Sequence, residues 1–155
     1  MRALLDRLYG PVVIDAVLDA PVDDVYAVLA DPSTYPHWLV GALATRRIDD
    51  DFPEPGTTFD HTVGARSVLE IPDSTEGLGT DGGRFLALRV HVGPFVARVT
   101  FELAAAPGGR THVHFSEQPL GPVAALTPLF RLVLAARNAE SMRRLAAVVS
   151  TPVGA

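Results

Sequence analysis

The sequence predicts an α+β domain in which one long C-terminal helix covers one face of an antiparallel sheet. Two patterns carry this prediction. Apolar and polar residues alternate through much of 57–117, and apolar residues recur at helical spacing through 128–149. The length of 155 residues suits a single domain. An antiparallel sheet must bury its apolar face, and one amphipathic helix of this length can cover it.

One strand and two short helices are expected first. Residues 12–19 are rich in valine and isoleucine, as is typical of a strand. Pro21 suits the first position of a helix, and Asp31-Pro32 ends that helix, because proline disfavours the helical conformation in the residue before it. Residues 33–38 predict a second helical turn that is stopped or bent near Pro36.

Six further strands are expected before the last helix, with an Asp-Gly hairpin turn at 80–83. Pro72 is expected to bulge the third of them. The strands cover residues 43–49, 57–63, 68–71, 84–92, 95–103 and 111–117. Alternation predicts an inward face made of Phe59, His61, Val63, Leu86, Leu88, Val90, Val92, Phe95, Ala97, Val99, Phe101, Leu103, Val113 and Phe115.

The last helix is expected to begin near Pro128 and to carry one apolar stripe. The stripe consists of Phe130, Leu134, Met142, Leu145 and Val149, with Asn138 and Ser141 on the same face. A buried amide such as that of Asn138 needs partners, which either a ligand or a neighbouring strand would supply.

Composition excludes several kinds of chemistry. All 13 basic residues are arginine, and cysteine is absent. The chain therefore has no thiolate nucleophile, disulfide, Fe–S cluster or cysteine-ligated zinc, and no lysine for a Schiff base or a phosphate loop. The formal net charge of -5 argues against a nucleic-acid partner, which needs a basic face. We expect no cofactor and no metal.

The predicted domain covers residues 12–150, with an N-terminal extension at 1–11 and a flexible tail at 151–155. Asp6 and Arg7 interrupt the extension, which lacks the features of a signal peptide. No apolar run approaches the length of about 18 residues that a membrane span needs. The expected location is therefore the cytoplasm.

Four segments resemble the START/Bet v 1-like (SRPBCC) superfamily. They are residues 21–31, 35–38, 55–61 and 137–145. Bacterial members are often described as polyketide cyclase/dehydrase and lipid-transport proteins. The resemblance implies a helix-grip fold, in which a curved seven-stranded sheet surrounds the C-terminal helix and encloses a hydrophobic cavity. It supplies no universal catalytic motif, because one fold hosts many sites.

We therefore expect a monomer or homodimer that binds a small hydrophobic ligand, lipid-like or polyketide-like, between sheet and helix. Two alternatives stay open: a polyketide cyclase, aromatase or dehydratase with His61 as the acid–base group, and a protein–protein interaction module. The resemblance implies that Tyr35 and Trp38 close one end of the cavity. The expected ligand contacts are Tyr35, Trp38, Phe59, His61, Leu69, Leu88, Val99, Phe101, Phe115, Phe130, Leu134 and Asn138.

The partner of His61 depends on strand register. A two-residue loop at 65–66 would place Glu70 opposite His61, on the same face. A loop one residue longer would turn Leu69 and Ile71 inward instead, which the apolar alternation favours. The facing of Asp73 is left open.

Two other motifs have ordinary explanations. His112 and His114 share one strand face, but it is the outer, polar face, so we expect a solvated surface rather than a metal site. Residues 77–82 match G-x-G-x-x-G, but a strand follows where a dinucleotide site needs a helix.

Overall fold

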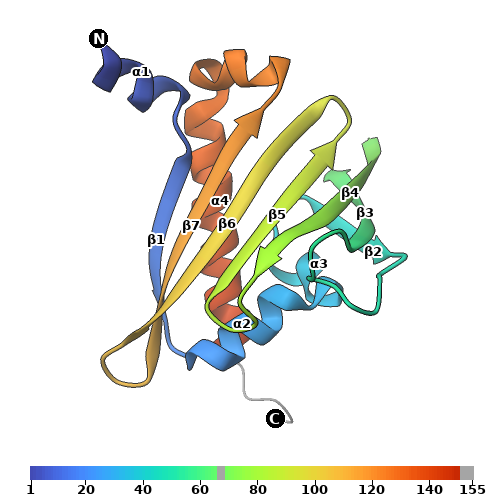
Figure 1. Ribbon diagram of the computed structural model, residues 1–155, viewed down its shortest axis with the longest axis vertical. Coiled ribbons are helices and arrows are strands. Elements are labelled where there is room, and N and C mark those ends of the chain that lie inside the picture. The colour runs from blue at the N-terminus through green and yellow to red at the C-terminus, as the bar shows by residue number, and fades with distance from the viewer. Residues whose placement is uncertain (66–68, 151–155) are drawn as a thin grey trace.

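The alternating segments form one antiparallel sheet of seven strands in the order β1-β7-β6-β5-β4-β3-β2 (Figure 1). The computed structural model describes residues 1–65 and 69–150, without the side chains of residues 65 and 69–72. The strands are β1 (Val12–Leu18), β2 (Ala42–Arg46), β3 (Thr58–Ala65), β4 (Leu69–Thr80), β5 (Phe85–Val92), β6 (Phe95–Ala106) and β7 (Arg110–Leu120).

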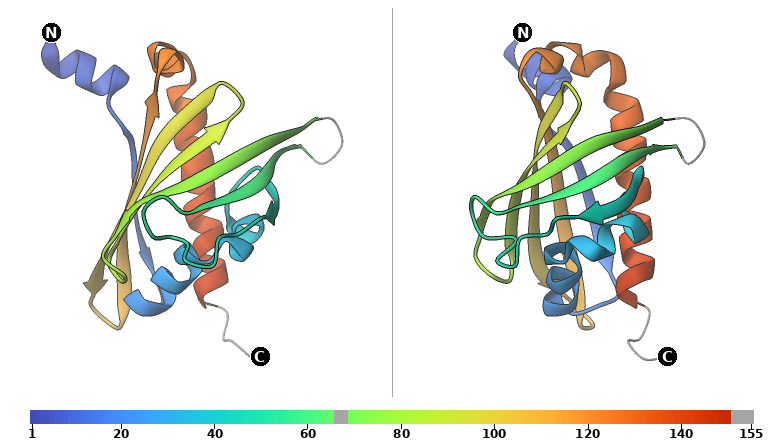
Figure 2. Two further views of the ribbon diagram at one scale, coloured as in Figure 1. Left: turned by 45° about the vertical axis from the view of Figure 1, so that its right-hand side comes forward. Right: turned by 90° about the vertical axis from the view of Figure 1, so that its right-hand side faces the viewer.

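The sheet curves around α4, which lies along its concave face, so the predicted helix-grip architecture is confirmed (Figure 2). Helices α2 and α3 lie at the end of the sheet nearest the C-terminal part of α4, and α1 lies at the opposite end (Figure 1). The helices are α1 (Arg2–Tyr9), α2 (Val22–Ala30), η1 (Pro32–Thr34), α3 (Tyr35–Trp38), η2 (Pro122–Leu126) and α4 (Thr127–Ser150).

The core lies between the inner sheet face and α4. Apolar side chains that the alternation predicts to point inward are buried there, and the middle of α4 adds Leu134, Met142 and Leu145. Burial of each such side chain contributes about 1.5–3 kcal/mol, which explains why the alternation fixes the facing of each strand. The sheet contributes Leu86, Leu88, Val99, Phe101, Leu103, Val113 and Phe115.

Several boundaries differ from the sequence predictions. Strand β4 runs through Pro72 to Thr80, and its register against β5 shifts between Gly77 and Gly79 instead. Pro36 does not stop α3, because it occupies the first turn, where its missing N–H costs nothing. The predictions lacked η2 and the helix within residues 1–11.

The register of the β3–β4 hairpin decides which residue meets His61. Asp73 pairs with His61, and Glu70 pairs with Gly64. The arrangement with Glu70 opposite His61 is therefore wrong. The connection at 66–68, the side chains of Leu69 and Ile71, and the tail at 151–155 lie outside the described residues.

Within the described part of the chain, no helix combines the length and apolar character needed to cross a membrane.

Candidate functional site

The inner sheet face carries a buried glutamate that is bonded to α4. Glu117 follows Val113 and Phe115 on β7 with the same inward parity, and it is 3% exposed. The amide Nδ2 of Asn138, a residue that is fully buried on α4, donates to Oε2 of Glu117 at 2.7 Å. The amide of Asn138 thus finds its partner within the fold.

Arg137 completes a cluster of three polar side chains, which we call the Glu117 cluster. Its Nη1 lies 3.7 Å from Oε2 of Glu117 and donates to Oδ1 of Asn138 at 3.3 Å. Its Nε donates to the carbonyl of Val40 at 3.2 Å. Among the described residues, Nη2 of Arg137 and Oε1 of Glu117 make no hydrogen bond, so a donor and an acceptor remain for another molecule.

A pocket of about 470 Å³ adjoins the Glu117 cluster, between the sheet and the first half of α4. Apart from Gly41, its other lining residues are apolar, and its charged residues are Glu117 and Arg137. Its volume falls within the roughly 300–1,000 Å³ of small-molecule sites, which are mostly apolar with few polar groups. The apolar lining includes Val63, Val90, Val92, Phe95, Phe130 and Leu134.

A second cavity of about 40 Å³ lies on the other side of the Glu117 cluster. Aromatic side chains fill this region: Phe101 stacks on Phe115 at a centroid distance of 4.8 Å, and Trp38 meets Phe101 edge-on. The Tyr35 hydroxyl donates to the Leu29 carbonyl at 2.7 Å. Burial raises the pKa of Tyr35, so its phenol stays protonated and keeps donating to that carbonyl.

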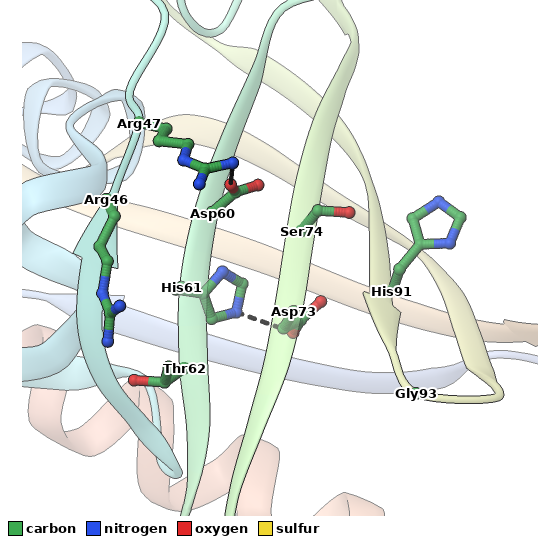
Figure 3. Close-up of a pocket in the computed structure, with 9 residues that line it drawn as sticks. All are labelled: Arg46, Arg47, Asp60, His61, Thr62, Asp73, Ser74, His91 and Gly93. Carbon is green, nitrogen blue, oxygen red and sulfur yellow. Dashed lines mark ion pairs between the residues drawn. The ribbon is translucent and has the colours of Figure 1, made fainter.

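His61 and Asp73 form a second buried ionic group on the inner face. Their side chains are 1% and 0% exposed, and Nε2 lies 2.8 Å from Oδ2 (Figure 3). The geometry of this contact is not that of a hydrogen bond. Among the described residues, Nδ1 of His61 and both oxygens of Asp73 have no hydrogen-bond partner. Unpartnered buried polar atoms are uncommon in folded proteins, so this pair needs an explanation beyond packing.

The outer face of the same strands holds a groove of about 490 Å³ (Figure 3). One row of paired positions, Arg46, Asp60, Ser74 and His91, crosses it from β2 to β5. Arg47 contacts Asp60 at 3.6 Å there. His61 and Asp73 also belong to the lining of this groove, although their side chains are 1% and 0% exposed.

The predicted ligand contacts fall into several groups. Phe130 and Leu134 line the pocket of about 470 Å³ beside α4. Phe59 packs edge-on against Tyr35 and Phe52 in the core, and the position of the Leu69 side chain lies outside the described residues. Six predicted contacts line the small cavity: Tyr35, Trp38, Leu88, Val99, Phe101 and Phe115.

The sequence interpretation missed Glu117 and Arg137. The sequence did contain the information for Glu117. It lies two residues after Phe115, which itself lies two residues after Val113, so all three side chains face inward on β7. Arg137 directly precedes Asn138 on α4. Neighbouring residues of a helix point in different directions, so the sequence does not indicate that the two side-chain ends lie close together. A long arginine side chain reaches around the helix to the same pocket.

The histidines of the outer face behave as a solvated surface. Asp15 contacts His114 Nδ1 at 2.9 Å and His112 Nε2 at 3.0 Å. The hydrogen bond from His114 lowers the pKa of Asp15. Among the described residues, no group of three His, Asp or Glu side chains is arranged so that it could hold a metal ion. The glycines at 77–82 end β4 and enter the turn before β5, as expected.

Comparison with protein families places the chain. The model of the family described as "Polyketide cyclase / dehydrase and lipid transport" matches residues 12–150. The chain belongs to this family. This match confirms the resemblance to the START/Bet v 1-like superfamily that the sequence predicted. No curated protein matches the sequence.

Solved structures with the same fold come from several bacteria. A Chromobacterium violaceum protein is 19% identical with a TM-score of 0.73, and covers 92% of this chain and 98% of its own. A Nitrosomonas europaea protein is 18% identical with a TM-score of 0.71, over 90% of this chain and 93% of its own. The Zhui aromatase/cyclase of a Streptomyces species is 16% identical with a TM-score of 0.71, and the match covers 94% of this chain and 96% of that protein. At these identities the likeness shows the fold.

Proposed function

We propose that the protein binds a small hydrophobic or amphipathic molecule, lipid-like or polyketide-like, in the pocket of about 470 Å³ beside α4. The observation that carries this proposal is an apolar wall with one charged corner, formed by Glu117 and Arg137. Apolar walls supply affinity and a few polar groups fix orientation. The family description, which names lipid transport and polyketide chemistry, supports the same ligand class.

The charged corner favours a ligand with an oxygen function at one end. A ligand hydroxyl can donate to Glu117, whose Oε1 has no partner among the described residues. A ligand carbonyl or carboxylate can accept from Nη2 of Arg137, which is likewise unpaired there. A hydrocarbon without oxygen would leave Oε1 of Glu117 and Nη2 of Arg137 desolvated without a hydrogen bond, which costs on the order of 1–3 kcal/mol per group.

A pocket-filling substitution tests the proposal. Val63 lines the pocket on β3, and Val63→Trp would occupy much of the space. Val13→Trp is the matched control, because Val13 is 40% exposed on β1. Titration with a fluorescent fatty acid should show saturable binding for the native protein and Val13→Trp, and strongly weakened binding for Val63→Trp. Native mass spectrometry would identify a ligand retained from expression.

Circular dichroism of each variant must show that the fold is intact, because overpacking a core costs about 1–3 kcal/mol. Equal binding by a folded Val63→Trp variant would place the ligand elsewhere. Absence of saturable binding by the native protein to fatty acids and to aromatic polyketides would reject the proposal.

The second candidate is acid–base chemistry of the cyclase or dehydratase type, with His61 as the proton-transfer group. The Nδ1 of His61, which has no partner among the described residues, favours it, because a neutral imidazole nitrogen can accept a proton from an activated carbon or a hydroxyl. Asp73 would orient the ring through the contact at 2.8 Å. If turnover of every accepted polyketide survives His61→Ala unchanged, this candidate is rejected while the binding proposal stands.

A further inference from the structure

Exposed apolar side chains gather at one end of the molecule, on α1, η2 and the start of α4. Leu129, Leu132 and Val133 of α4 are 82%, 85% and 72% exposed, at helical spacings of three and four. Leu4, Leu5 and Leu8 repeat that spacing on α1 and are 60%, 49% and 36% exposed. With Leu126 they form what we call the apolar end surface. A concentration of large exposed apolar residues of this kind marks an interaction site.

The backbone behind this surface is held in place. Arg131 donates from Nη1 to the Gly10 carbonyl at 2.7 Å and from Nη2 to the Pro11 carbonyl at 2.9 Å. Gln118 donates to the Tyr9 carbonyl at 3.1 Å. Helix α1 contacts α4 but buries none of its residues, so its apolar stripe stays largely open to solvent. An amphipathic helix needs a surface for its apolar face.

The charge at this end is opposite to that of the whole chain. Residues 1–11 and 118–139 contain four arginines and one acidic residue, Asp6, in a chain of formal net charge -5. Arg137 is neutralised by Glu117, which leaves Arg2, Arg7 and Arg131. Exposed leucines flanked by arginines suit the interface of an anionic bilayer, where apolar side chains enter the acyl boundary and cations meet head groups.

The apolar end surface also borders the pocket. Leu126 is 51% exposed and lines the pocket, and Phe130 lines it one turn before Leu134. A bilayer that contacts the apolar end surface would therefore lie next to the pocket.

We propose that the apolar end surface docks the protein peripherally on an anionic lipid bilayer. Leu129, Leu132 and Val133 enter the acyl boundary beside α1, and Arg2 and Arg7 face the head groups. This docking does not require any particular ligand in the pocket.

Vesicle sedimentation tests the docking. We expect the native protein to sediment with vesicles of equal parts phosphatidylglycerol and phosphatidylcholine, less with phosphatidylcholine alone, and less as salt rises. The triple variant Leu129→Ser, Leu132→Ser, Val133→Ser should lower the partition coefficient by more than about tenfold. The matched control replaces the exposed residues Val13, Val17 and Ile48, which are 40%, 51% and 40% exposed, by serine, and should partition like the native protein.

Three results would overturn the docking proposal. The native protein could fail to sediment with either vesicle. The triple variant could sediment as well as the control. Sedimentation velocity could show a homodimer that the triple variant dissociates, in which case the occupant is a second copy. Binding of the fluorescent fatty acid without vesicles should be equal in the triple variant and the native protein, so failure of docking and failure of the pocket proposal are distinguishable.

Discussion

Replacing Asn138 by alanine tests whether the Glu117 cluster forms in solution. Asn138 is 0% exposed, and its amide donates at 2.7 Å to a carboxylate whose residue is 3% exposed. A hydrogen bond to a charged group contributes about 1.5–3 kcal/mol. Arg137 stays 3.7 Å from the carboxylate, so the loss should not reach the roughly 3–5 kcal/mol of an unpaired buried charge. We therefore expect Asn138→Ala to lower the free energy of unfolding by about 2–3 kcal/mol.

Urea unfolding followed by circular dichroism measures this loss, with Glu117→Gln and the double variant completing a thermodynamic cycle. We expect a coupling energy of at least about 1 kcal/mol between the two positions. Gln118→Ala is the matched amide control, because Gln118 is only half-buried; it should change stability by less than about 1 kcal/mol. A cost of Asn138→Ala below about 0.5 kcal/mol with zero coupling would refute the reasoning.

Two further predictions concern β4 and the turn after it. A Cβ on Gly77 would lie 2.5 Å from a carbonyl oxygen of the facing loop, so Gly77→Ala should destabilise by about 1–3 kcal/mol, whereas Gly83→Ala, with open space around it, should be nearly neutral in urea unfolding. Backbone N–H groups of Arg84, then Gly83 and Phe85, hold the pKa of Asp81 below its usual value. A folded pKa below the unfolded value of about 3.9 stabilises the protein at higher pH. The difference in Tm between the native protein and Asp81→Asn should therefore be constant near neutrality and shrink as the pH falls below about 4 and through the folded pKa. A difference that does not shrink at all as the pH falls from about 5 to about 2 would contradict this.

The facing of the strands was predictable because burial has a period of two along a strand. Phe101 and Phe115 lie inward as their alternation predicts, and each is 2% exposed. The partner of His61 was not predictable by the same rule. Alternation fixes which face a residue occupies, whereas the pairing of His61 with Asp73 depends on loop length.

The position of the pocket was equally hidden from sequence. Tyr35, Trp38 and Phe101 were expected to line a ligand cavity, yet their rings fill most of the space between them and leave about 40 Å³. The larger space occurs near Val63 and Phe130, where small and β-branched side chains face α4. Alternation along a strand predicts which side chains face the interior. The volume left empty between them depends on how closely the aromatic rings pack, which alternation does not predict.

The two buried ionic groups differ in how completely they are satisfied, and this difference leads to a last prediction. Glu117 accepts from Asn138, whereas three buried polar atoms of His61 and Asp73 have no hydrogen bond within the described part of the chain. Stability alone gives no reason for such a pair, because well-packed apolar replacements of buried ion pairs are often neutral or stabilising by about 1–4 kcal/mol.

If the pair serves binding or proton transfer, the double variant His61→Phe, Asp73→Leu should unfold at equal or higher urea concentration than the native protein, while losing turnover or affinity for oxygen-bearing ligands. His61→Phe alone should be destabilising, because it leaves the buried Asp73 carboxylate without its charged partner. A double variant that is markedly less stable would show that the pair is structural, with its open atoms satisfied by bound water. In that case the proton-transfer candidate would lose its main support.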